Sequence, residues 1–180
     1  MTGLSFDDLD GNMECGHESR SFTHGPKPIV KLFRTASDEA SFITQEIKKL
    51  IDTGVNANDI CVVTRTKRLL DSYASAISAA GMRCFEIKQS KADDRSMNGV
   101  RLATMHRIKG LEFEYVFAAA VNDGIVPLEA AIDHTDLVSE NETLKTEKCL
   151  IYVALTRTRR CAYVTCFGRP STFLPNCPSS

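Results

Sequence analysis

Residues 59–87 have the sequence DICVVTRTKRLLDSYASAISAAGMRCFEI, and this stretch indicates the fold of the chain. One strand is predicted over 59–63 and another over 82–87. Between them, apolar residues recur on one side of a predicted helix over roughly 67–80, which ends at Gly81. A strand, a helix and a second strand in this order are typical of a parallel sheet, because parallel neighbours need a long crossover connection.

The same alternation continues before and after this stretch. Further helices are predicted from Ser37 to about Thr53 and from Ser139 to about Arg157, and further strands over 29–33, 100–104, 115–121 and 161–167. Most of the strands are continuously apolar, so both faces of the sheet are expected to be covered. The sequence therefore predicts an α/β fold of three layers with a mainly parallel sheet.

Polar residues predict where two of the helices begin. Ser37 can cap the first helix, and the acidic pair Asp38 and Glu39 suits the positive end of that helix better than it suits Mg²⁺ binding. Ser139, followed three residues later by Glu142, forms a capping box that would open the last helix.

Length and composition indicate one domain, since the chain has 180 residues and is 43% hydrophobic. Residues 1–27 are predicted to be an irregular arm or linker, residues 28–174 the folded domain and residues 175–180 a tail. The net charge of −1 gives no overall signature of nucleic-acid binding, although a local basic groove stays possible. With no membrane span or signal-peptide pattern and with seven cysteines lacking any CxxC pair, a reduced, cytoplasmic protein is expected.

Two segments concentrate reactive side chains. Residues 104–113, TMHRIKGLEF, follow a predicted strand and supply a hydroxyl, an imidazole, two cations, a glycine and a carboxylate. Ligands of open parallel sheets bind at the carboxyl ends of strands, which makes this segment a candidate site. Residues 152–160, YVALTRTRR, end a predicted helix with three arginines.

These segments resemble two motifs of the superfamily 1 DNA helicases of the UvrD/Rep type. Residues 104–113 match every specified position of motif V, T-x-H-x-x-K-G-L-E-[FW], and residues 152–158 match motif VI, Y-V-A-x-T-R-[AT]. Residues 59–66 and 122–127 are similar to two further segments of these helicases. The resemblance covers about residues 28–174 and implies the second, C-terminal RecA-like domain, with the fold of P-loop NTPases.

The resemblance also implies roles for individual residues. Glu112 would accept a hydrogen bond from the ribose of ATP, and Gly110 would let the backbone approach the nucleotide. Arg157 would be the catalytic residue, reaching the γ-phosphate as an arginine finger does, because guanidinium is permanently charged and bidentate toward phosphate. Thr104 and His106 would contact the backbone of single-stranded DNA, and Lys109 could steady either ligand.

The other half of such an ATP site is absent from the sequence. No G-x-x-x-x-G-K-[ST] motif occurs, and neither a Walker B motif nor the N-Y-R segment of these helicases is found. ATP with Mg²⁺ is therefore expected only in a full-length protein, bound together with an upstream RecA-like domain, and the chain alone is expected to be inactive. No metal site is predicted, since His17, His24 and His134 lack partners at metal-site spacing.

Other interpretations of the sequence stay open. The chain could be a nucleic-acid-binding or interaction module that keeps the helicase fold without its motor activity. It could also be another doubly wound nucleotide-binding domain, such as a flavodoxin-like regulator. Lys67 and Arg68 are electrostatically unfavourable at a helix start, which hints at phosphate contact, although a solvated face is the simpler explanation. Arg159 and Arg160 could simply complement the end of their helix, and Met97 and Met105 are expected to be packing residues.

Overall fold

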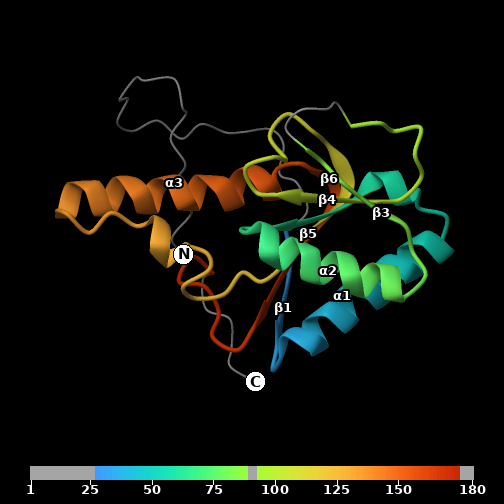
Figure 1. The fold of residues 1–180 in the computed structure, drawn as a ribbon, viewed down its shortest axis with the longest axis horizontal. Helices are drawn as coiled ribbons and strands as arrows, with labels where there is room; N and C mark the ends of the chain where they lie inside the picture. The colour runs from blue at the N-terminus through green and yellow to red at the C-terminus, as the bar shows by residue number, and fades with distance from the viewer. Residues whose placement is uncertain (1–26, 89–92, 175–180) are drawn as a thin grey trace.

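The computed structural model describes residues 27–88 and 93–174, and within them six strands form one parallel sheet (Figure 1). The sheet has the order β1-β6-β5-β2-β4-β3, and every neighbouring pair runs in the same direction. The strands are β1 (Ile29–Phe33), β2 (Ile60–Thr64), β3 (Cys84–Glu86), β4 (Val100–Thr104), β5 (Phe113–Ala118) and β6 (Thr158–Phe167). The helices are α1 (Ala36–Asp52), α2 (Lys67–Ala79) and α3 (Leu137–Leu155), with short 3₁₀ turns η1 (Ala57–Asp59) and η2 (Glu129–Ala131).

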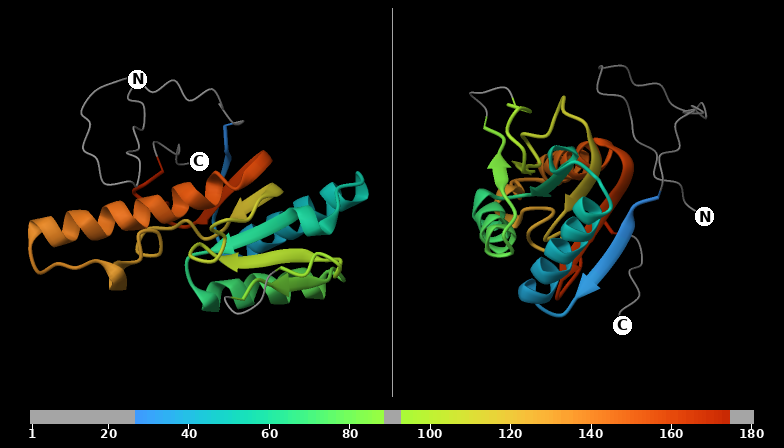
Figure 2. Two further views of the ribbon diagram at one scale, coloured as in Figure 1. Left: turned by 90° about the horizontal axis from the view of Figure 1, so that it is seen from above. Right: turned by 90° about the vertical axis from the view of Figure 1, so that its right-hand side faces the viewer.

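The predicted three-layer α/β architecture is confirmed. The helices α1 and α2 cover one face of the sheet and α3 covers the other, as the left view of Figure 2 shows. Alternation along β2 explains how one strand serves both layers: Ile60 and Val62 pack in the cluster under α1 and α2, whereas Cys61 and Val63 pack in the cluster under α3. All four side chains are fully buried, which is why the strand is continuously apolar.

The helix starts differ from the predicted ones. The hydroxyl of Thr35, rather than of Ser37, caps α1 by accepting a hydrogen bond from Asp38 N at 3.1 Å. The capping box at Ser139 is likewise wrong, because α3 begins at Leu137 and Asp136 is its cap. Asp136 Oδ1 accepts from the N–H groups of Val138 and Ser139 at 2.8 and 2.9 Å, so the helix begins two residues before the predicted cap.

Glu39 does more than complement the end of α1. Its side chain is completely buried, and Oε1 accepts a hydrogen bond from Ala120 N at 3.0 Å while Oε2 accepts one from the hydroxyl of Tyr73. Ala120 follows β5 and has a φ of 56°, a left-handed conformation that is unusual for a residue other than glycine. Glu39 therefore lies in the first turn of α1, as predicted, and also joins α1, α2 and the end of β5.

Residues 93–99, which lead into β4, are held from within by Arg101. This guanidinium is fully buried in β4 and donates to Asp93 Oδ1 at 2.7 Å and to Asn58 Oδ1 at 3.1 Å. It also donates to the backbone carbonyls of Asp94, Met97 and Gly99 at 2.7 to 2.9 Å. A charge this deep is tolerated because its donors are satisfied, and these hydrogen bonds hold residues 93–99 beside η1.

Candidate functional site

The segment 104–113 is the crossover from β4 to β5. It runs from the carboxyl ends of the strands, the carboxyl edge of the sheet, back to their amino ends, the amino edge. Thr104 ends β4 and Phe113 begins β5, and both strands run parallel to β2. Thr104 therefore lies at the carboxyl edge of the sheet, while Gly110 and Glu112 lie toward the amino edge. The segment thus begins at the carboxyl ends of the strands, as predicted, whereas the candidate residues Gly110 and Glu112 lie at the opposite edge from the one that was expected to carry the site.

The middle of this segment is fixed by packing. Met105 and Ile108 are buried in the hydrophobic cluster under α3, which confirms the packing role expected of Met105. The same expectation is wrong for Met97, which lies in the loop before β4 and is 48% exposed. Gly110 has a φ of +84°, a conformation that other residues adopt only with strain. A Cβ at Gly110 would meet no atom within 4 Å, so the backbone conformation, rather than lack of space, requires glycine there.

Glu112 and Arg157 meet at the amino edge of the sheet. Phe113, the first residue of β5, pairs with Thr158, the first residue of β6, and Phe113 N donates to the carbonyl of Arg157 at 2.9 Å. Glu112 immediately precedes β5 and Arg157 immediately precedes β6, so the pairing of these two strands brings the two residues side by side. The tertiary structure thus joins the two sequence segments that were singled out separately.

The ion-pair partner of Glu112 is Arg159, which was expected only to complement a helix end. Arg159 and Arg160 lie in β6, not at the end of α3, so that interpretation is wrong. Arg159 Nε and a terminal guanidinium nitrogen both donate to Oε2 of Glu112, at 2.9 and 2.5 Å. Hydrogen bonds and charge from Arg159, with a smaller contribution from the charge of Arg157, hold the pKa of Glu112 below its ordinary value.

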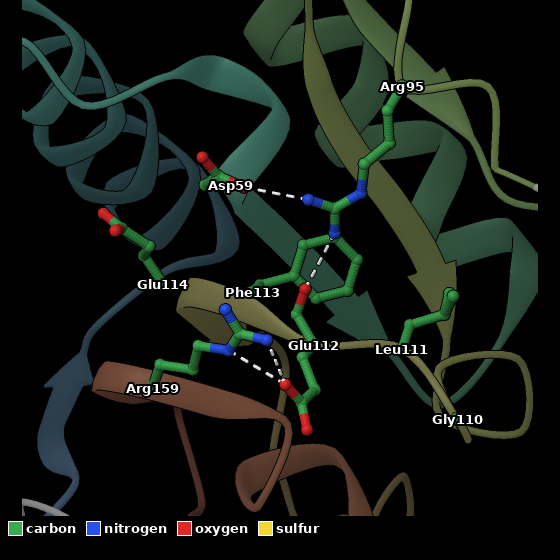
Figure 3. A pocket seen from close by; sticks show the side chains of 8 residues that line it. All are labelled: Asp59, Arg95, Gly110, Leu111, Glu112, Phe113, Glu114 and Arg159. Carbon is green, nitrogen blue, oxygen red and sulfur yellow. Dashed lines mark hydrogen bonds and ion pairs between the residues drawn. The ribbon is translucent and has the colours of Figure 1, made fainter.

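A pocket of about 400 Å³ opens at this edge (Figure 3). Its wall combines the end of the crossover segment with residues from η1, β5, β6 and the loop before β4, namely Asp59, Arg95, Gly110, Leu111, Glu112, Phe113, Glu114 and Arg159. The lining is therefore mostly polar and includes two arginines and three carboxylates. Such a lining suits a polar ligand with hydroxyl groups better than an apolar one.

Arg95 is a pocket residue that the sequence did not indicate. It donates to Asp59 Oδ1 at 3.0 Å and to the carbonyl of Glu112 at 2.9 Å, and its guanidinium lies 5.7 Å from the centre of the Phe113 ring. These contacts attach the loop between β3 and β4 to the backbone of Glu112. Nothing in the polar, turn-rich sequence around Arg95 distinguishes it from a solvated arginine.

The guanidinium of Arg157 makes its hydrogen bonds to neutral acceptors. Its Nε donates to the carbonyl of Val153 at 3.3 Å, and a terminal nitrogen donates to the hydroxyl of Thr156 at 3.4 Å. Both acceptors are uncharged, and within residues 27–88 and 93–174 no ion pair involves Arg157. A half-buried cation held only by neutral groups is available for an anionic ligand.

The carboxyl edge carries a second pocket, of about 280 Å³, around Thr104. Three cations, Lys67, Lys88 and Arg107, line this pocket together with Glu86 and Ile87. Lys67, at the first turn of α2, forms ion pairs with Asp71 and Glu86, which offsets its unfavourable place at a helix start. Lys109 is exposed within the crossover, on the way to the amino edge.

His106 lies near a buried ion pair that the sequence did not reveal. Arg65, after β2, donates to both carboxylate oxygens of Glu147 in α3, at 2.9 and 2.6 Å, and Glu147 also accepts from Leu128 N at 2.9 Å. Burial raises the pKa of Glu147, but the hydrogen bonds from Arg65 and from Leu128 N, together with the charge of Arg65, outweigh it and bring the pKa below its ordinary value. Burial and then the charge of Arg65 lower the pKa of His106, which favours the neutral imidazole.

Three further observations bound the chemistry of the described residues. No group of three or more His, Cys, Asp and Glu side chains is arranged to hold a metal ion in residues 27–88 and 93–174. The cysteines of these two ranges, which are Cys61, Cys84, Cys149, Cys161 and Cys166, are all free thiols. None of the helices α1, α2 and α3 is both long and apolar enough to cross a membrane.

Comparison with known proteins yields one consistent family. The model of the UvrD-like helicase C-terminal domain matches residues 6–96 and 86–168. The putative ATP-dependent DNA helicase YjcD of Bacillus subtilis is 31% identical over 149 residues, which is 83% of this chain and 18% of YjcD. The ATP-dependent DNA helicase PcrA of Staphylococcus aureus is 36% identical over 85 residues, 44% of this chain and 11% of PcrA.

A solved structure agrees on the fold. The C-terminal domain of a possible DNA helicase from Lactobacillus plantarum superposes with a TM-score of 0.61 over 83% of this chain and 79% of that one, at 17% identity. The chain spans less than a fifth of the length of YjcD and PcrA, the curated relatives that it matches.

Proposed function

Because the chain belongs to the family of UvrD-like helicase C-terminal domains, we propose that it is one motor domain of an ATP-dependent DNA helicase and that its amino edge forms half of the ATP site. The observation that carries this proposal is the pairing of Phe113 with Thr158, which sets Glu112 and Arg157 side by side. Glu112 and Arg157 are 45 residues apart in the sequence, and the two segments that contain them, each matching a helicase motif, would otherwise have no reason to meet.

The proposed roles follow from the chemistry of each side chain. The Glu112 carboxylate accepts a hydrogen bond from the ribose, and the bend at Gly110 lets the backbone approach the nucleotide. Arg157 reaches the γ-phosphate and stabilises the charge that develops as the phosphoryl group is transferred. Among the described residues Arg157 has no carboxylate partner, and this supports the role, because a guanidinium that is already neutralised would have to lose its partner before binding phosphate.

The phosphate cradle and the Mg²⁺ ligands belong to another RecA-like domain in this proposal. The sequence has no phosphate-binding loop, and the described residues include no carboxylate cluster suited to a cation. ATP would bind between the two domains, and its contacts with both would favour the closed arrangement. This chain alone would then not hydrolyse ATP, whereas the complete helicase would.

Replacing Arg157 with alanine in the complete helicase tests the ATP site. We expect kcat for ATP hydrolysis to fall about 100-fold or more, because an arginine finger acts mainly on the transition state. The KM for ATP and the affinity for a nonhydrolysable analogue should change little. Arg160→Ala removes a neighbouring, exposed arginine and is the matched control. Equal turnover in the two variants would contradict the proposed role of Arg157.

The carboxyl edge is proposed to carry the single-stranded DNA. Thr104 and His106 would contact the DNA backbone, and Lys109 would add a charge where the crossover turns away from this edge. The cluster of Lys67, Lys88 and Arg107 around the Thr104 pocket supports this assignment, since a path for single-stranded DNA needs cations and hydroxyls more than base-reading groups. ATP and DNA would therefore contact opposite edges of one sheet.

Salt dependence of DNA binding tests this edge. Arg107→Ala should weaken the binding of single strands of unrelated sequence to a similar degree and reduce the slope of log K against log salt by about 1, because one phosphate contact is lost. Lys49→Ala, an exposed cation at the far end of α1, is the control and should leave the slope unchanged. An unchanged slope with Arg107→Ala would count against a DNA path at this edge.

The same experiments address the alternative of a module without motor activity. Such a module would bind DNA at the carboxyl edge, and Arg157→Ala would have no effect on any ATP-dependent activity. Family membership leaves the alternative of a flavodoxin-like regulator without support.

A further inference from the structure

The two oxygens of the Glu112 carboxylate have different surroundings. Both donors of Arg159 point to Oε2, and within residues 27–88 and 93–174 no hydrogen bond to Oε1 is formed. A carboxylate oxygen has two lone pairs and can accept from a hydroxyl group. Oε1 is thus the oxygen that can receive a ligand, and Figure 3 shows Arg159 and Glu112 facing each other at the pocket wall.

The backbone positions of both residues are fixed independently of this ion pair. Arg159 follows Thr158, the residue of β6 that pairs with Phe113. Arg95 holds the carbonyl of Glu112 at 2.9 Å from the opposite side of the pocket. Only the side chain of Glu112 is left free to turn, since it is about half exposed at 54%. The Arg159 guanidinium limits that freedom by binding one oxygen with two donors.

We propose that Arg159 is a positioning residue, which holds the Glu112 carboxylate so that Oε1 faces a hydroxyl group of a bound nucleotide. This inference rests on the proposed function, in which Glu112 accepts from the ribose. Arg159 also occupies the carboxylate that would otherwise be free to pair with Arg157, whose charge already acts on Glu112. Arg159 therefore contributes to nucleotide affinity without touching the phosphates.

The prediction is an effect on KM that leaves kcat nearly unchanged. In the complete helicase at saturating single-stranded DNA, Arg159→Ala should raise the KM for ATP by about two- to fivefold, the range expected for loss of an exposed ion pair. Arg159→Lys should be intermediate, because an ammonium ion does not present the two parallel donors of a guanidinium. Arg160→Ala removes the same charge from the next residue, which pairs with Glu114 instead, and should leave KM unchanged.

A double-mutant cycle separates positioning from direct contact. Glu112→Ala should itself raise the KM by about tenfold, since a charge-assisted hydrogen bond is lost. Adding Arg159→Ala to Glu112→Ala should have no further effect, because there is no carboxylate left to position. The substrate can be changed instead of Glu112. One of 2′-deoxyATP and 3′-deoxyATP lacks the ribose hydroxyl that donates to Glu112, and for that analogue the KM of Arg159→Ala should equal the KM of the unmodified helicase.

The outcomes are distinguishable. If Arg159→Ala raises KM equally with and without Glu112, Arg159 contacts the nucleotide itself and the positioning role is overturned. If Arg159→Ala behaves like Arg160→Ala while Glu112→Ala still raises KM, the inference fails and the proposed function stands. If Glu112→Ala also leaves KM unchanged, the proposed role of Glu112 in the ATP site is itself refuted.

Discussion

Removing the carboxylate of Glu147 should destabilise this domain strongly. The side chains of Glu147 and Arg65 are only 5% and 10% exposed, and Glu147 also satisfies the N–H of Leu128. Glu147→Ala leaves a nearly buried guanidinium and a backbone donor without their acceptor. Breaking a buried pair in this way costs about 3 kcal/mol, and with a urea m-value of about 2 kcal/mol/M the unfolding midpoint should fall by about 1.5 M.

Urea unfolding followed by circular dichroism measures this change, since the chain has no tryptophan to report by fluorescence. Glu142→Ala, an exposed glutamate on the same helix, is the control and should shift the midpoint only slightly. A second arm uses Arg65→Met, which leaves the carboxylate buried without its cation. Adding Glu147→Gln to Arg65→Met should restore stability, because the buried charge disappears while the amide oxygen still accepts from Leu128 N.

The reasoning also fixes how the stabilisation depends on pH. The pKa of Glu147 in the folded protein lies below its ordinary value of 4.5, so the folded state prefers the ionised form. The stabilisation is therefore complete above about pH 4.5 and is lost as the pH falls through the lower folded-state pKa. A midpoint shift no larger than that of Glu142→Ala, or strictly additive costs for Arg65→Met and Glu147→Gln, would refute the buried pair.

Two more predictions concern other parts of the domain. Glu39→Ala should lower the free energy of unfolding by about 2–4 kcal/mol, because it leaves the buried N–H of Ala120 and the hydroxyl of Tyr73 without an acceptor. Glu39→Gln should lower it clearly less. Equal losses in the two variants would argue against these hydrogen bonds. Gly110→Ala should cost about 1 kcal/mol in the same assay, since alanine is strained at a φ of +84°, and an unchanged midpoint would show that the segment adopts another conformation.

Much of the architecture could be predicted because it is encoded locally. The strands β1 and β4 have the predicted bounds, and α2 begins at the predicted residue. Buried strands are continuously apolar and surface helices show a repeat of apolar residues, so both patterns are visible in a short window of sequence. The caps were harder, because Asp136 stands before the exposed apolar residues Leu137 and Val138, which do not resemble the buried side of a helix.

The candidate site also has a part that could be predicted from the sequence and a part that could not. Gly110, Glu112 and Arg157 could be named from two sequence segments, yet their common place at the amino edge depends on β5 and β6 being neighbours. Arg159 is 47 residues from Glu112, and Arg65 is 82 residues from Glu147, so no local pattern indicates either pair. A charged residue in a loop looks the same in the sequence whether it is solvated or paired.

By itself, the sequence determined the alternation of strands and helices and the three layers that follow from it, and it supplied the residues that we propose to bind phosphate, ribose and DNA. Hydrophobic periodicity and side-chain chemistry are properties of short segments, so both can be recognised in the sequence before the fold is known. Only the tertiary structure decided which residues meet. The sheet order sends the segment 104–113 from one edge to the other, so Thr104 and Glu112 separate while Glu112, Arg157 and Arg159 converge. The physical reason is that strand pairing and burial are chosen by the whole core at once, and the partner of each charge follows from that choice.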